Sequence, residues 1–141
     1  MFVGNYIEWN KEIDDKIQST FNGANRASTH PNSLKGMPST LFRNDGERGV
    51  TDTMLETGIF VHNETSEIHL SKALGTDPID VNDDNLIDII VANDSIKNFF
   101  FVNKSNGVFE ESADIYGLQY NFLGLPTAAM GIDGSWSGDA E

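Results

Sequence analysis

The chain has 141 residues, enough for one domain with a modest core, and its formal net charge of −13 comes from 22 acidic and 9 basic residues. A surface this acidic does not suit nucleic acid or an anionic membrane, and it suits divalent cations. The absence of cysteine excludes disulfides and thiol chemistry, and no apolar run approaches the roughly 20 residues of a membrane span.

The first half of the chain is expected to form strands around a polar insertion. The opening residues lack the basic start and apolar core of a signal peptide, and the pattern predicts a strand over about 2–9. Residues 11–38 are rich in Ser, Thr, Asn and Gly, which indicates a surface excursion without a core of its own. Strands are expected over 39–44 and 50–54, and a hairpin turn explains Asp45-Gly-Glu47 better than a cation site does.

The second half is expected to form a further run of strands, over 73–80, 87–93, 98–103, 108–112 and 127–133. The β-branched run Ile87–Asn93 has about the length of a buried strand, and Pro78 disfavours a helix before it. Aromatic residues are expected to pack in the core: Trp9, Phe42, Phe99 to Phe101, Phe109 and Trp136.

Asp80–Asp88 is the segment with the clearest chemistry. Oxygen-bearing side chains stand at loop positions 1, 3, 5 and 9, which are Asp80, Asn82, Asp84 and Asp88. Ca²⁺ takes six to eight hard oxygen ligands, and three carboxylates this close would repel one another without a cation. The spacing therefore predicts a calcium site, and an acidic surface turn without an ion is the alternative.

An EF-hand begins with the same spacing but is excluded here. That motif needs a bidentate Glu at loop position 12 and a Gly at position 6, where this chain has Val91 and Asn85. Asn tolerates the left-handed backbone conformation, so the tight turn survives. With strand-forming residues on both sides, the segment predicts a strand–loop–strand calcium site.

The sequence also matches itself after a shift of 59 residues. Leu41–Asn44 falls on Phe100–Asn103, Val50–Asp52 on Phe109–Glu111, and Gly58-Ile59 on Gly117-Leu118. A period of 40–60 residues with several short strands per unit is typical of β-propellers.

These motifs resemble the calcium-binding repeats of integrin-α-like β-propellers, the FG-GAP and VCBS types, and are most similar to the cartilage acidic protein/UnbV (ASPIC) group. The resemblance rests on Leu74-Gly75, the loop, Val91–Asp94, Asn98–Asn103 and Val108–Glu111. It implies side-chain calcium ligands at Asp80, Asn82, Asp84 and Asp88, and a main-chain ligand at the Leu86 carbonyl. Asn85 in place of the usual Gly is a departure, and so is the lack of a Cys pair in the insertion.

The expected fold is all-β, a partial β-propeller of about two four-stranded blades. Residues 1–72 would hold the first blade with the insertion at about 11–38, residues 73–126 the second blade, and residues 127–141 the first strand of a third. Ser135–Asp139 looks like the start of a second, degenerate metal loop, but two serines replace carboxylates and the last ligand position is missing.

By analogy with this family, the expected function is a calcium-binding extracellular interaction or adhesion module with a structural metal. Its partner would be an unidentified protein or glycan, and its location secreted, periplasmic or at the cell surface. One alternative is a self-assembling building block, a homo-oligomer formed through exposed strand edges. Another is a fragment of a propeller enzyme, although His30, His62 and His69 lack metal spacing and no catalytic cluster is evident.

Overall fold

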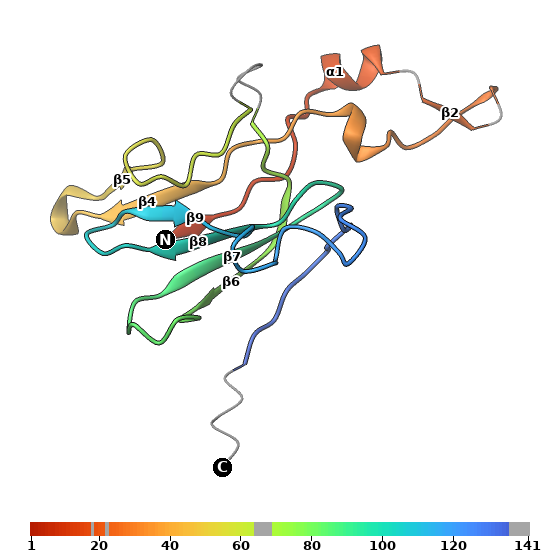
Figure 1. Cartoon of the computed structure of the whole chain (residues 1–141). Helices are drawn as coiled ribbons and strands as arrows, with labels where there is room; N and C mark the ends of the chain where they lie inside the picture. The colour runs from red at the N-terminus through yellow and green to blue at the C-terminus, as the bar shows by residue number, and fades with distance from the viewer. Residues whose placement is uncertain (18, 22, 64–68, 136–141) are drawn as a thin grey trace.

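A computed structural model describes residues 1–17, 19–21, 23–63 and 69–135, and in this part of the chain the fold is all-β with three antiparallel sheets (Figure 1). The elements are, in chain order, β1 (Phe2–Val3), α1 (Lys11–Lys16), β2 (Thr20–Phe21), β3 (Asn25–Arg26), a 3-10 turn (Pro31–Ser33), β4 (Thr40–Asn44), a second 3-10 turn (Gly46–Arg48), β5 (Val50–Asp52), β6 (Ala73–Ile79), β7 (Asp88–Asn93), β8 (Phe99–Asn103) and β9 (Phe109–Glu111).

The largest sheet is a four-stranded meander in the order β6-β7-β8-β9. Its two central strands are apolar on both faces, because each face is covered. In β8, Phe99, Phe100, Phe101 and Val102 are each at most 2% exposed. In β7 the register places Ile89 opposite Phe101 and Val91 opposite Phe99. We refer to β6–β9 and the chain that follows, to residue 120, as the second unit.

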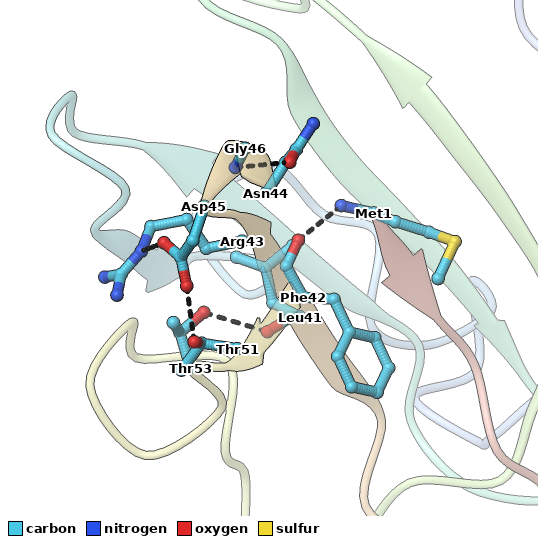
Figure 2. A network of polar contacts seen from close by, with 9 residues as sticks. All are labelled: Met1, Leu41, Phe42, Arg43, Asn44, Asp45, Gly46, Thr51 and Thr53. Atoms are coloured by element: carbon cyan, nitrogen blue, oxygen red, sulfur yellow. Dashed lines mark hydrogen bonds and ion pairs between the residues drawn. The ribbon is translucent and has the colours of Figure 1, made fainter. Parts of the chain in front are cut away.

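The second large sheet has three strands in the order β1-β4-β5. We call this sheet, together with the chain from β1 to Tyr6 and the chain after β5 to residue 61, the first unit. Phe2 pairs with Leu41. Met1 lengthens β1, because its ammonium group donates to the Phe42 carbonyl at 2.6 Å and its carbonyl accepts from the Phe42 amide at 2.8 Å (Figure 2).

An apolar core joins the two units. Phe2 and Leu41 of the first unit pack against a cluster that contains Ile59 and the β7 and β8 side chains. The rings of Phe2 and Phe101 have their centroids 6.4 Å apart. Two backbone bonds cross the same boundary: the Phe109 amide donates to the Thr57 carbonyl at 2.7 Å, and the Ala73 amide to the Asn5 carbonyl at 3.0 Å.

The hydrogen bonds of the first unit recur in the second with the 59-residue shift. In each unit the bonds close the hairpin turn, continue the ladder beyond the last strand, and then form a helical turn. The equivalent pairs are Asp45 N to Gly49 O and Lys104 N to Val108 O, Thr53 N to Leu41 O and Ser112 N to Phe100 O, and Thr57 N to Thr53 O and Tyr116 N to Ser112 O. The sequence match therefore corresponds to the same local structure made twice.

Two expected strands are shorter than the sequence suggested. The strand over 2–9 ends at Val3; the side-chain amide of Asn5 then donates to the Pro38 carbonyl at 2.8 Å, and Ile7 makes an isolated bridge to Gly36. In the described part of 127–133, a single bridge from Ala128 to Asp94 replaces the expected strand.

The insertion contains structure that the sequence did not reveal. Asn10 caps α1 by accepting from the Ile13 amide at 2.8 Å, and β2 and β3 form a small hairpin. No residue of α1 is buried, and Figure 1 shows this arm projecting from the sheets. Trp9 is 61% exposed at its base, so its expected place in the core is wrong, while Trp136 lies outside the described residues. The helices of the described chain are too short or too polar to cross a bilayer.

Gly58 and Gly117 are equivalent positions that test the contact between the units. Both have a positive φ, but a Cβ on Gly58 would lie 2.2 Å from the Phe109 carbonyl oxygen, whereas a Cβ on Gly117 would meet nothing within 4 Å. We expect Gly117→Ala to cost only the left-handed strain of about 1–2 kcal/mol. Gly58→Ala should cost about 2 kcal/mol more by overpacking, as measured by urea unfolding at low protein concentration. Equal losses for the two variants would contradict the described packing.

Candidate calcium loop

The candidate loop connects β6 to β7 and is closed at its base by the pairing of Ile79 with Asp88. Asp83 and Asn85 both have a positive φ, at 57° and 65°, which lets the backbone curl tightly. Asn85 therefore takes the left-handed position for which the resembled repeats use Gly, as its tolerance of that conformation predicted.

The side chains at loop positions 1, 3 and 5 turn back towards the backbone of the loop. The Asp80 carboxylate accepts from the amides of Asp84 at 3.2 Å and Asn85 at 2.8 Å. Asn82 Oδ1 also accepts from the Asp84 amide at 3.2 Å, and Asp84 Oδ1 accepts from the Leu86 amide at 2.8 Å. The side-chain oxygens of these three residues and Leu86 are thus brought together within one turn of the loop.

Asp88, at position 9, is placed differently because it is completely buried at the start of β7. Its Oδ2 accepts from the Val81 amide at 3.1 Å, and its Oδ1 accepts from the Asn103 amide at 2.8 Å. The Asn103 side chain in turn donates to the Ile87 carbonyl at 3.0 Å. Asp88 therefore ties the beginning of the loop to the end of β8.

The charge of Asp88 has no cationic partner among the ion pairs of the described residues. Burial of a carboxylate is costly unless it is paired, and backbone amides compensate only in part. The charge of Asp84 in the loop also acts on Lys104, whose pKa is raised mainly by its hydrogen bond with Glu110.

The donor set suits calcium in its chemistry, because all five predicted ligands offer oxygen. Within the described chain, however, no three acidic or His side chains already form a group that could hold a metal ion. Two of the predicted ligands, the Asn82 amide and the Leu86 carbonyl, are not of those types. The calcium site stays a prediction, and the later residues of Ser135–Asp139 lie outside the described residues.

Asn103 is a residue of this site that sequence reasoning missed. Its Oδ1 also accepts from the Ser105 amide at 3.0 Å, as Asn44 Oδ1 accepts from the Gly46 amide at 2.9 Å. Asn44 and Asn103 occupy equivalent positions under the 59-residue shift, and this recurrence was the sequence signal that could have identified Asn103.

Asn93 and Asp94 form a separate buried polar cluster at the opposite end of β7 from the loop. Asn93 accepts from the Lys72 amide at 2.9 Å and donates to the Lys97 carbonyl at 3.0 Å. Asp94 accepts from the Tyr6 hydroxyl at 2.6 Å, which lowers the pKa of the carboxyl group. Burial, and then this bond, raises the pKa of Tyr6 to about 12. The cluster links the two units rather than supporting the loop.

The acidic turn of the first unit is explained by its hairpin, as expected. Figure 2 shows the Asp45 carboxylate between the Arg43 side chain, whose Nε donates at 2.9 Å, and the Thr51 hydroxyl. The hydrogen bond from Thr51, and then that from Arg43, lowers the pKa of Asp45. Both carboxylate oxygens therefore serve the β4–β5 hairpin.

The histidines have structural neighbours. His62 and His69 form an isolated bridge, and their rings contact Phe60, tilted with centroids 5.2 Å apart for His62 and edge-on at 4.7 Å for His69. His30 accepts from the Asn32 amide at 3.2 Å.

No protein-family model, curated protein or solved structure matches the chain.

Asp88→Asn tests the structural part of this site. The amide can present only one acceptor oxygen and would turn its NH₂ group towards a backbone donor, so one buried amide loses its partner. We expect a loss of about 2–4 kcal/mol in the free energy of unfolding, measured in chelator so that only the hydrogen bonds are tested. Asp83→Asn removes the same charge from an exposed loop position and should change stability little. Equal effects of the two variants would contradict the described role of Asp88.

Tyr6→Phe tests the link between the units. The raised pKa means that the protonated phenol is favoured in the folded state, so its contribution is complete below pH 10 and is lost as the pH rises towards about 12. We expect the variant to lose about 1.5–3 kcal/mol at neutral pH, with the difference from wild type shrinking between about pH 10 and 12. The absorbance of tyrosinate should show one of the three tyrosines ionising near pH 12 in the wild type only.

Proposed function

We propose that this chain is a calcium-stabilised interaction module, built from two neighbouring units of an integrin-α-like β-propeller. The observation that carries the proposal is the fully buried Asp88 carboxylate, which has no cationic partner among the described residues and adjoins a loop of oxygen donors. A divalent cation is the partner that such a group lacks.

In this proposal the side chains of Asp80, Asn82 and Asp84 and the Leu86 carbonyl would hold Ca²⁺, with Asp88 as the fourth side-chain ligand. A carboxylate has about four lone-pair sites, so Asp88 can keep its two amide bonds and still take part. When bound, the ion would offset two of the three negative charges of the carboxylates. It would thereby fix the loop that joins β6 to β7, which makes its role structural.

The propeller assignment is supported by the four-stranded antiparallel meander of the second unit and by the repeated hydrogen bonds. The first unit, with β1-β4-β5, corresponds to the last three strands of such a blade. Both large sheets present one face to a shared core, as stacked blades do.

The interaction role follows from this fold by analogy alone. We propose binding of a protein or glycan outside the cytoplasm rather than catalysis, with nucleic acid disfavoured by the net charge of −13. Self-assembly is the second candidate function, and it is favoured by the local structure that the two units share.

Asp84→Asn and Asp83→Asn form a matched pair that tests the calcium site. Each removes one charge from adjacent loop positions, but only Asp84 turns its carboxylate into the loop. At a calcium concentration about 100 times Kd, binding adds about 2.7 kcal/mol of stability. For a chain of this size that raises the melting temperature by roughly 5–10 °C. We expect this increase in wild type and Asp83→Asn, and a much smaller one in Asp84→Asn.

Calorimetric titration with CaCl₂ should find one site in the wild type, weakened at least ten-fold by Asp84→Asn. Magnesium is the control ion, because its strict octahedral geometry suits this flexible loop poorly. Melting that is indifferent to calcium, or equal calcium binding by the two variants, would contradict the proposal.

A further inference from the structure

The contact between the two units has a counterpart that is only partly covered. The first unit contributes five side chains to the shared core: Phe2, Leu41, Met54, Ile59 and Val61. In the second unit the strand register and the 59-residue shift place five apolar residues at the same positions: Ile90, Phe100, Ala113, Leu118 and Tyr120. We call this second set the trailing face.

Four of these residues already form a small cluster, in which Phe100 and Ala113 are buried and Ile90 and Leu118 are partly buried. Phe100 and Ala113 are fully buried, and the Tyr116 ring packs edge-on against Phe100 with centroids 4.7 Å apart. Leu118 is only half-buried and Tyr120 is 43% exposed, whereas Ile59, the equivalent of Leu118, is 2% exposed. Phe100 and Ala113 are thus already covered inside the second unit, and the trailing face is less covered than the internal interface only at its edge, Leu118 and Tyr120.

The backbone shows the same difference at the turn that follows. Gly58 lies so close to β9 that a Cβ would stand 2.2 Å from the Phe109 carbonyl oxygen, while the space at Gly117 is open. Next to it, Thr57 accepts the Phe109 amide. The equivalent acceptor in the second unit is the Tyr116 carbonyl.

The opposite face of the first unit carries the complementary set. In the second unit, Ile89, Val91, Phe101 and Phe109 face the first unit. Their equivalents in the first unit are Met1, Val3, Phe42 and Val50. Met1 is 75% and Val50 64% exposed. We call this set the leading face.

We propose that the trailing face of one chain docks on the leading face of a second copy, repeating the contact that the chain makes between its own units. The two faces differ, so the contact is heterologous and continues into a ring or filament rather than stopping at a dimer. The amide of Val50 in the second copy would donate to the Tyr116 carbonyl, as Phe109 does to Thr57. The inference rests on the equivalence of the two units and not on calcium.

The mass of the intact chain, measured by light scattering and sedimentation over a wide concentration range, tests this. Copies that each carry a charge of −13 repel one another, so about 0.5 M NaCl is used to screen that charge to within about 5 Å. We expect the mass to grow with concentration beyond that of a dimer.

Gly117→Asn is the decisive variant. Asn tolerates the positive φ at this open position, but its side chain would fill the space needed for close approach. We expect the association constant to fall at least ten-fold. Gly23→Asn is the matched control, with a positive φ and open space in the insertion arm, and it should associate like the wild type.

A monomeric mass throughout, a dimer that does not grow, or normal association of Gly117→Asn would each overturn the proposal. If Gly117→Asn melts at a lower temperature than Gly23→Asn, the exposed substitution Tyr120→Glu replaces it and should weaken association in the same way. None of these results depends on the calcium titration, so failure of one proposal leaves the other intact.

Discussion

The packing of the first unit against β7 and β8 is the interaction on which the rest of the structure depends. These strands are apolar on both faces, so they are stable only where both faces are covered. One face is covered by Phe2, Leu41 and Ile59, which come from a sheet that has no comparable core of its own. The two units therefore stabilise each other and are expected to fold together. Hydrogen bonds such as that from the Phe109 amide to the Thr57 carbonyl fix the alignment of their apolar surfaces.

Local pattern sufficed to predict the strands that this core dictates. The apolar runs of β7 and β8 have the length of buried strands, and turns rich in Gly and Asn separate the strands along the chain. Pattern failed where a single side chain or a distant backbone decides. The strand at Phe2 ends at Val3, and the Asn5 side chain then bonds to Pro38, 33 residues away. Helix α1 depends on a cap by Asn10 within a polar segment.

The residues of the candidate site could be predicted from the sequence, but the different structural roles of their side chains could not. The spacing from Asp80 to Asp88 treated the four side chains as alike, yet three form the turn and one is buried in the sheet. Burial of Asp88 depends on Asn103, whose amide reaches it from β8, and that contact is invisible in the loop sequence. Through Asp88, the exposed loop is thus hydrogen-bonded to the end of β8, one of the two central strands.

This connection also separates the two proposals in physical terms. Ca²⁺ at the loop would strengthen the edge where β6 meets β7, at the opposite end of β7 from the buried pair Tyr6 and Asp94. The trailing face instead lies on the side of the second unit away from the first, around Phe100 of β8 and Leu118 after β9. An ion that stiffens the second unit would order this face without touching it, so calcium could favour assembly only indirectly, through the fraction of chains whose β7 and β8 are correctly packed.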